Sequence, residues 1–211
     1  GDGACEFYDM FIPENVGANA DVLLTVHGGA WIFGNGSEFN EDCREAAKAG
    51  FVAVNMDYQK IQNGVNAYDM DDEIGTAIAS IKTELENLGI TPDNIILAGH
   101  SAGAHLSLMY AYTHYNDCPV NIAFVVSNCA PTDFYKDAVE QTTQMGKLAH
   151  FALTGLTGNY IFKSLPENQK ELIDSVSPVT MVTSEVPPTI VVQGDKDEMV
   201  PFSNSADLYN A

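Results

Sequence analysis

The sequence has few basic residues and no long apolar run. Its 211 residues include 9 Lys and Arg against 29 Asp and Glu, which gives a formal net charge of −20. Such an excess of negative charge repels nucleic acid and anionic membrane surfaces, so we expect neither as a partner. No stretch approaches the roughly 20 apolar residues that a membrane-spanning helix needs. The acidic residues are scattered, which is typical of a solvated surface.

The sequence also lacks any C-x-x-C pair. Its four cysteines, Cys5, Cys43, Cys118 and Cys129, lie far apart. Buried free thiols are the favoured interpretation, which points to a reducing, cytoplasmic compartment, although four cysteines could also pair. The first ten residues lack a charged-then-apolar signal pattern, but the chain begins without methionine. A secreted protein with a removed signal peptide therefore stays open as an alternative.

The most informative segment that is present lies at residues 94–106, where an apolar run breaks into G-H-S-A-G and then continues as a helical pattern of small residues. In a strand–turn–helix context, G-x-S-x-G forms a nucleophile elbow. The turn strains the serine backbone, so the residues two before and two after it must be small, as Gly99 and Gly103 are. The pattern predicts Ser101 as a catalytic nucleophile; the alternative is a glycine-rich turn with a solvated serine.

A second glycine-rich loop follows an earlier predicted strand. Residues 22–26 read as a short buried strand, and H-G-G-A-W follows at 27–31. Acyl transfer builds negative charge on a carbonyl oxygen, so the site needs backbone N–H donors already aimed there. An H-G-G-x loop ahead of the elbow predicts such an oxyanion hole, formed by the N–H groups of Gly29, Ala30 and Ala102. An ordinary turn would not explain why both motifs occur in this order.

Together with Asp57-Tyr58 and G-D-K-D-E-M-V-P at 194–201, these motifs resemble the α/β-hydrolase carboxylesterases. The resemblance is closest to the small bacterial esterase/lipase group with feruloyl-esterase-like and hormone-sensitive-lipase-like members. It covers nearly the whole chain and is specific to the fold, not to a substrate. It implies a single α/β-hydrolase domain over residues 1–211, with a small helical cap inserted at about 134–183 above the acyl pocket.

Strands and helices alternate along the chain, which predicts a mostly parallel sheet with helices on both faces. The expected strands are residues 7–11, 22–26, 51–56, 94–98, 122–127 and 189–193, and the expected helices are 38–49, 68–88, 101–113 and 203–211. Only one strand precedes residue 22, where the resemblance implies two or three. This shortfall at the start, together with the missing C-terminal histidine described below, leads us to expect a chain trimmed at both ends.

A serine hydroxyl needs a base to take its proton and an acid to orient that base. In this fold the chain order is serine, acid, histidine. Resemblance to a G-x-x-D-x-x-V-P pattern after the last predicted strand points to Asp197 as the acid. Asp195 is the near alternative, and Asp133, after the preceding strand, is the third.

The histidine is missing from its expected place, because fourteen residues follow Asp197 and none is histidine. The five histidines present are expected in other roles: loop support for His27, scaffold contact for His100, helix packing for His105, exposure near a helix end for His114, and a place in the cap for His150. Three explanations compete: a longer hydrolase with its histidine beyond Ala211, which we favour, a separate cleaved chain, or a degenerate hydrolase.

The sequence thus predicts a serine carboxylesterase that hydrolyses short-chain or aryl esters through an acyl-enzyme on Ser101. The mechanism needs neither a metal nor an organic cofactor, and the expected partner is a small-molecule ester. Trp31 and Phe33 are candidates for lining the substrate pocket, although packing roles are equally good. The alternatives are an amide hydrolase of the kynurenine-formamidase type, which resembles this chain in its H-G-G-x-W loop, and a non-catalytic binding module. The oligomeric state stays open.

Overall fold

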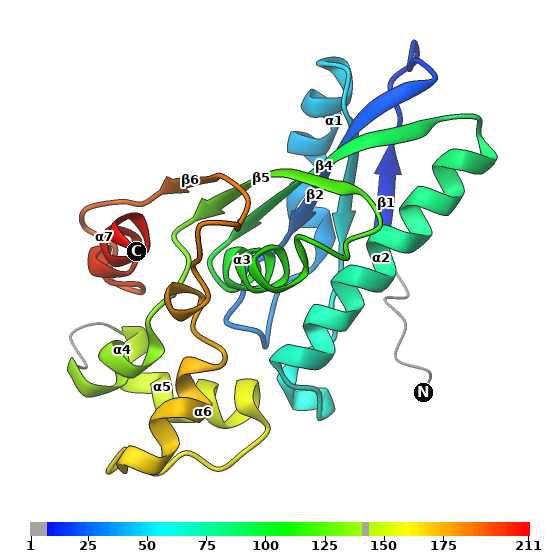
Figure 1. Cartoon of the computed structure of the whole chain (residues 1–211). Helices are drawn as coiled ribbons and strands as arrows, with labels where there is room; N and C mark the ends of the chain where they lie inside the picture. The colour runs from blue at the N-terminus through cyan, green and yellow to red at the C-terminus, as the bar shows by residue number, and fades with distance from the viewer. Residues whose placement is uncertain (1–7, 141–143) are drawn as a thin grey trace.

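The computed structural model describes residues 8–140 and 144–211, and its centre is a six-stranded sheet (Figure 1). The strand order is β1-β3-β2-β4-β5-β6. β1 pairs antiparallel with β3, and all other neighbouring strands are parallel, which confirms the predicted sheet. The strands are β1 (Tyr8–Phe11), β2 (Asn19–Val26), β3 (Val52–Met56), β4 (Thr91–His100), β5 (Asn121–Asn128) and β6 (Thr189–Val192).

The register of the sheet brings the carboxyl ends of its parallel strands to one edge. Val26, the last residue of β2, pairs with Met56 on one side and Gly99 on the other. Asn128, the last residue of β5, pairs with His100 and with Val192. The five loops that follow these strands therefore start side by side, at the edge where open α/β sheets bind their ligands.

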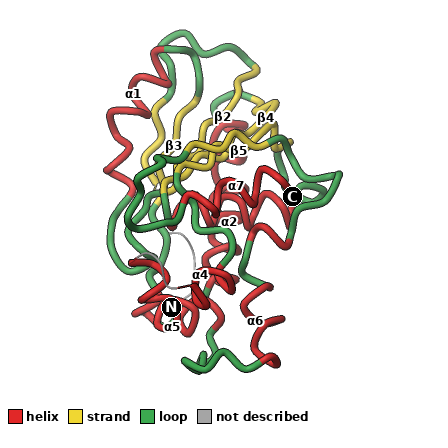
Figure 2. Tube along the Cα trace, turned by 90° about the vertical axis from the view of Figure 1, so that its left-hand side faces the viewer, coloured by secondary structure: helices red, strands yellow, loops and turns green. Residues whose placement is uncertain are grey.

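Seven α-helices and four 3₁₀ turns occur in the described part of the chain. In the view of Figure 2, α1 lies on one side of the sheet and α2 and α7 lie on the other. The helices are α1 (Asn40–Lys48), α2 (Ala67–Asn87), α3 (Ala102–His114), α4 (Phe134–Glu140), α5 (Gln144–Thr157), α6 (Lys170–Asp174) and α7 (Phe202–Asn210). The 3₁₀ turns are η1 (Gly36–Phe39), η2 (Ile61–Asn63), η3 (Glu167–Gln169) and η4 (Pro178–Thr180).

The predicted helices form for the local reasons that the sequence suggests. Helix α2 begins with a capping box, in which the Asn66 side chain accepts hydrogen bonds from the N–H groups of Tyr68 and Asp69. Its isoleucines at helical spacing are buried against the sheet, and Gly89 follows the helix with a φ of +78°. Strand β2 starts three residues before the predicted boundary, because Asn19 pairs with Thr91 of β4 beyond the apolar run.

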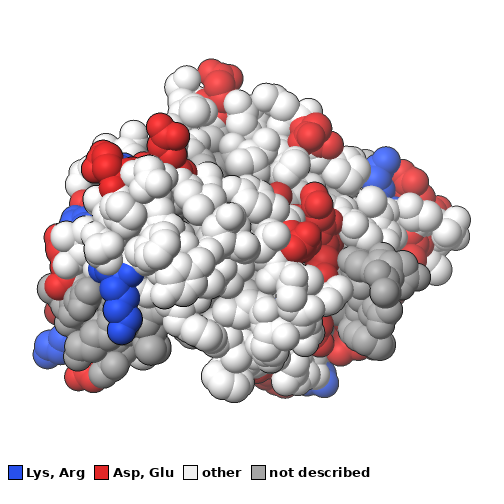
Figure 3. Space-filling model, turned by 90° about the horizontal axis from the view of Figure 1, so that it is seen from below, with Lys and Arg blue, Asp and Glu red and all other residues white. Residues whose placement is uncertain are grey.

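The segment that breaks the alternation of strands and helices carries α4, α5 and α6. These helices gather beyond the carboxyl edge of the sheet (Figure 1). None of the helices in residues 8–140 and 144–211 is long and apolar enough to cross a membrane. On the face drawn in Figure 3, acidic side chains lie at several separate places.

Candidate active site

Ser101 occupies the sharp turn between β4 and α3. Its backbone has φ 52° and ψ −116°, a strained conformation for a residue other than glycine. The turn is held from two sides: the Ser101 N–H donates to the Asn128 carbonyl at 2.8 Å, and its carbonyl accepts from the His105 N–H at 3.0 Å. Neighbouring structure therefore keeps a conformation that an isolated peptide would avoid.

The two glycines of G-H-S-A-G are required by close backbone packing. A Cβ atom on Gly99 would collide with the backbone of Gly103, and a Cβ atom on Gly103 would collide with the carbonyl oxygens of Val26 and His27. Both collisions involve backbone atoms, which cannot move aside as a flexible side chain could. Glycine at these two positions thus lets α3 start directly against the end of β2.

The loop after β2 runs beside Ser101. A Cβ atom on Gly28 would lie 3.5 Å from the Ser101 Cβ atom. Three consecutive residues follow with positive φ: Gly29 at 111°, Ala30 at 53° and Trp31 at 60°. Such dihedrals are costly for alanine and tryptophan, and strain of this kind is concentrated at functional sites. Ala102, on the other side of Ser101, is the first residue of α3, where backbone N–H groups lack helical partners.

Asp197 lies in the loop after β6, with its carboxylate held in place. Oδ1 accepts from the backbone N–H groups of Met199 at 2.8 Å and Val200 at 3.0 Å, and Oδ2 accepts from Gln193 Nε2 at 3.0 Å. Asp195, the near alternative, is exposed. The geometry of the loop therefore favours Asp197 as the ordered carboxylate.

Asp133, the third candidate for the acid, starts a helix. Its Oδ1 accepts from the backbone N–H of Lys136 at 3.0 Å, at the first turn of α4. That hydrogen bond is the one that a helix-capping carboxylate makes. The contact gives Asp133 a structural role that needs no catalysis.

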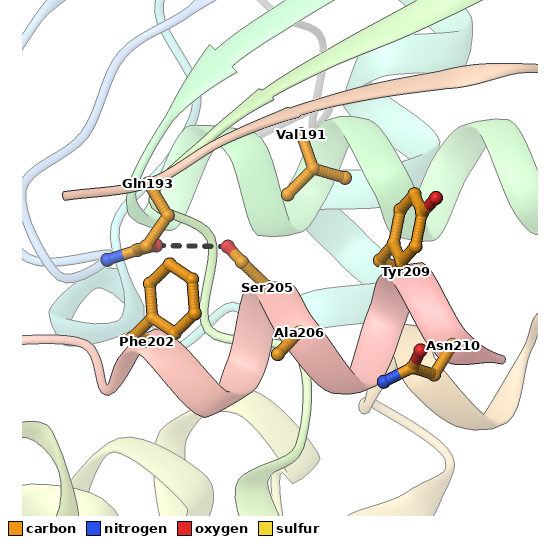
Figure 4. A pocket seen from close by; sticks show the side chains of 7 residues that line it. All are labelled: Val191, Gln193, Phe202, Ser205, Ala206, Tyr209 and Asn210. Carbon is orange, nitrogen blue, oxygen red and sulfur yellow. Dashed lines mark hydrogen bonds between the residues drawn. The ribbon is translucent and has the colours of Figure 1, made fainter. Parts of the chain in front are cut away.

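Gln193 connects the Asp197 loop to α7. Besides its bond to Asp197, Gln193 Nε2 donates to the Val200 carbonyl at 3.3 Å, and its Oε1 accepts from Ser205 Oγ at 3.1 Å (Figure 4). These side chains border a groove of about 360 Å³ between β6 and α7. The groove is lined by Val191, Gln193, Phe202, Ser205, Ala206, Tyr209 and Asn210.

Cys129 stands between the serine turn and the Asp197 loop, and the sequence did not single it out as a site residue. It has a φ of +48°, and its N–H donates to the Val192 carbonyl at 2.8 Å. Burial raises the pKa of its thiol, the Ser101 backbone opposes this effect, and the charge of Asp197 adds to it. The sequence feature that could have identified Cys129 is its position just after a predicted strand, because the carboxyl ends of parallel strands meet at one edge of the sheet.

The cysteines of the described part are all free thiols. Cys43 is buried as expected, whereas Cys118 and Cys129 are only half-buried, so the prediction of buried thiols was wrong for these two. Cys5 lies outside the described residues. In residues 8–140 and 144–211, no group of three or more His, Cys, Asp or Glu side chains could hold a metal ion.

The two candidates for lining the substrate pocket differ in exposure. Trp31 is fully buried, packs against Phe134, and donates from Nε1 to His105 Nδ1 at 3.2 Å. These contacts favour the packing role for Trp31. The Phe33 side chain is 71% exposed, so it is available to a ligand.

Two of the histidine expectations were wrong. His100 does not point into the scaffold but is exposed, and its Nδ1 would lie 2.8 Å from a Cβ atom on Gly28. His114 is half-buried between two carboxylates, with Asp71 Oδ2 at 2.9 Å and Asp117 Oδ1 at 3.1 Å. Neither environment places an imidazole between serine and acid.

His105 and His150 lie in surroundings close to those expected. His105 is completely buried, and burial lowers its pKa to about 4. Its Nε2 donates to the Val176 carbonyl at 2.8 Å, and its other nitrogen accepts from Trp31, which leaves no nitrogen for proton transfer. His150 is half-buried on α5, and burial lowers its pKa.

Sheet order, strand directions and the strained serine turn define the α/β-hydrolase fold. The chain belongs to the BD-FAE family, whose model matches residues 8–211. Esterase LipQ of Mycobacterium tuberculosis is 29% identical over 193 residues, which are 90% of this chain and 45% of LipQ. The kynurenine formamidase of Salmo salar is 27% identical over 131 residues, 60% of this chain and 43% of that enzyme.

Among solved structures, esterase B from Lactobacillus rhamnosis superposes with a TM-score of 0.77 at 19% identity. The alignment covers 96% of this chain and 65% of that chain. Together with the family model and the curated esterases, this confirms the resemblance to esterases and the predicted fold. The chain spans about half the length of the curated relatives it matches.

Proposed function

We propose that this chain carries the nucleophile of a serine carboxylesterase, and that the nucleophile is Ser101. The Ser101 hydroxyl attacks the ester carbonyl, the alcohol leaves with a proton, and water then hydrolyses the acyl-enzyme. The observation that carries this proposal is the strained Ser101 turn with the Gly28 backbone directly beside it. A strained serine at the carboxyl edge of a parallel sheet has no structural purpose that glycine would not serve at less cost.

The oxyanion hole in this proposal consists of the backbone N–H groups of Gly29, Ala30 and Ala102. The first two belong to the loop that passes Ser101, and the third begins α3. N–H groups at the start of a helix favour negative charge, and preorganised donors contribute most where charge develops during the reaction. Phe33, exposed at the end of the same loop, is proposed to contact the substrate.

Asp197 is proposed as the acid that orients the catalytic histidine. Its three hydrogen bonds fix the carboxylate, and the charge of Asp197 acts on Cys129, whose thiol also responds to the Ser101 backbone. Asp197 and Ser101 thus flank one residue at the same edge of the sheet. This arrangement leaves Asp195 as a turn residue.

The histidine is proposed to come from a segment beyond Ala211 that covers the outer edge of β6. In the described part of the chain β6 has no partner on that edge, and Ile190 and Val192 are 51% and 48% exposed. Unprotected apolar edges are rare because they invite pairing with other chains. The groove between β6 and α7 adds further apolar surface beside the Asp197 loop (Figure 4).

The substrate class that we propose is a short-chain or aryl ester. Hydrolysis of an aryl formamide is the second candidate, because a kynurenine formamidase is among the curated relatives. The full gene product should be assayed in parallel with an aryl ester and with N-formylkynurenine. A higher kcat/KM for the ester supports the first candidate, and the reverse ranking replaces it with the second.

The test of the nucleophile is the intact mass of the full gene product before and after treatment with a fluorophosphonate probe. We expect one probe per chain, attached to Ser101, and none in the Ser101→Ala variant. Labelling that persists in a folded Ser101→Ala variant would move the nucleophile elsewhere. A folded, unlabelled wild-type protein that binds an ester without turnover would instead support the non-catalytic binding module.

A further inference from the structure

Lys60 belongs to none of the motifs, yet it contacts the loop beside Ser101. It lies between β3 and η2, and its side chain is only 14% exposed. Its Nζ lies 2.8 Å from Nε2 of His27 and donates to the Tyr58 carbonyl at 2.6 Å. An ammonium group has only donors, so at this contact His27 Nε2 must be the acceptor.

This contact determines where His27 carries its proton. With Nε2 accepting, the neutral imidazole is protonated on Nδ1, which lies 2.6 Å from the Gly28 carbonyl oxygen and donates to it. His27 is fully buried and stacks on the Tyr58 ring, with 4.4 Å between ring centroids. The Tyr58 hydroxyl also donates to the His27 carbonyl at 3.1 Å. Hydrogen bonds therefore hold the backbone carbonyls of two successive loop residues, His27 and Gly28.

Holding the Gly28 carbonyl also aims the next N–H group. The peptide between Gly28 and Gly29 is planar and trans, so its N–H points opposite to its C=O. A hydrogen bond from His27 to the Gly28 oxygen consequently fixes the direction of the Gly29 N–H. Gly28 itself lies beside Ser101. Lys60 is thus linked to the proposed oxyanion hole through the His27 imidazole and the peptide between Gly28 and Gly29.

The charged groups around His27 would otherwise permit a second state. Burial lowers the pKa of His27, and the charge of Lys60 lowers it further, whereas the Gly28 carbonyl and the charges of Asp57 and Glu38 raise it. Asp57 Oδ1 lies 3.4 Å from the same Nε2 atom. Without Lys60 as a donor, the single ring proton of His27 could sit on Nε2 and point at Asp57, which would leave Nδ1 with no proton for the Gly28 carbonyl.

We infer that Lys60 is a positioning residue of the proposed esterase: it keeps His27 neutral with the proton on Nδ1 and so aims the Gly29 N–H at the oxyanion. The inference rests on the proposed function, but the protonation state of His27 is measurable without any turnover. Lys60 touches no substrate in this role and acts only through His27 and the loop.

The test compares Lys60→Met with Lys60→Arg, which retains a charged donor, and with Lys48→Met as a control. Lys48 is an exposed lysine of α1 paired with Glu45, so its replacement changes the net charge equally. We expect Lys60→Met to lower kcat for an aryl ester at least tenfold at neutral pH, with KM changed less than twofold. Lys60→Arg should recover part of kcat, and Lys48→Met should match wild type.

The direct readout is the imidazole ¹⁵N spectrum of His27, assigned with a His27→Gln variant. In wild type at neutral pH we expect a neutral ring protonated on Nδ1, and in Lys60→Met a neutral ring whose proton has moved to Nε2. A wild-type proton on Nε2, or a Lys60→Met variant with unchanged kcat and spectrum, would overturn the inference. If Lys60→Met fails to fold, the wild-type spectrum and Lys60→Arg still decide it. An inactive wild type with the expected spectrum would count against the esterase, not against the Lys60–His27 link.

Discussion

Gly28 lies against Ser101, so closely that a Cβ atom on the glycine would stand 3.5 Å from the serine Cβ atom. The two residues come from separate motifs, one after β2 and one after β4. These strands are neighbours in the sheet, and Val26 pairs with Gly99 just before the two loops begin. The pairing register is therefore what joins the glycine-rich loop and the serine turn into one site.

Replacing Ser101 by alanine should abolish ester hydrolysis and leave the fold intact. The substitution removes only the hydroxyl, and alanine meets no new contact in the turn. We expect kcat/KM to fall by more than about a thousandfold, to the level that sites without their nucleophile retain. Steady-state kinetics and the thermal midpoint should be measured together. A folded variant that keeps more than roughly a thousandth of wild-type activity would contradict the assignment.

Asp197→Asn should impair catalysis far more than Asp195→Asn does. The amide would place an N–H₂ group or a neutral oxygen where a histidine needs a carboxylate, and loss of such an orienting charge costs roughly 10⁴ in kcat. Asp195 is exposed, so its replacement should change kcat less than twofold. Both variants carry the same charge change, which makes them matched controls in one assay. The reverse ranking would move the acid to Asp195.

Gly103→Ala should destabilise the protein strongly, because the new methyl group would collide with the backbone oxygens of Val26 and His27. Overpacking of this kind costs about 1–3 kcal/mol, and more where only backbone can move. Gly17→Ala is the matched control, since its Cβ would find ordinary contact 3.4 Å from the Asn19 carbonyl oxygen. Urea denaturation of the two variants should show a clear gap. Equal midpoints would show that the serine turn tolerates a side chain at this position.

Titration of the Asp137 carboxyl should lower the free energy of unfolding as pH rises from about 4 to about 6. Burial raises the pKa of this carboxyl from 3.8 to about 6, against the opposing effect of its hydrogen bonds from Asn204 Nδ2, 3.0 Å to each oxygen. The folded state thus holds the proton more tightly than the unfolded state does. Above pH 6 the charged form is disfavoured by at most about 3 kcal/mol.

Asp137→Asn keeps the shape of the side chain and cannot titrate. Its free energy of unfolding should therefore lack the part of the decline between pH 4 and pH 6 that Asp137 causes. Urea midpoints at pH 4, 5, 6 and 7 for wild type and variant give the difference directly. Asp71, whose pKa burial also raises to about 6, titrates in both proteins and cancels in that difference. Parallel curves for the two proteins would rule out this role for Asp137.

Local patterns in the sequence were sufficient for much of the fold. The serine turn, the strand before it and α3 after it follow from an apolar run, two glycines and a run of small residues. Helix α2 follows from isoleucines at helical spacing and a terminal glycine. These features depend on steric fit and on periodicity over short stretches of chain. Both can be evaluated directly from the sequence.

Contacts between separate loops were not predictable in the same way. Trp31 was a candidate for substrate contact, but its ring packs between α3 and α4 and donates a hydrogen bond to His105. Cys129 gained a place between Ser101 and the Asp197 loop only because β5 lies between β4 and β6. Lys60 reaches His27 because β3 adjoins β2.

By itself the sequence determined the type of fold, the serine turn and the two glycine-rich motifs, since each is encoded by neighbouring residues. Tertiary structure decided which side chains surround the serine, which histidines are buried and neutral, and which aspartate is held by its loop. The physical reason is that these properties depend on distances between strands. Strand order and register set those distances, and both result from packing the whole sheet.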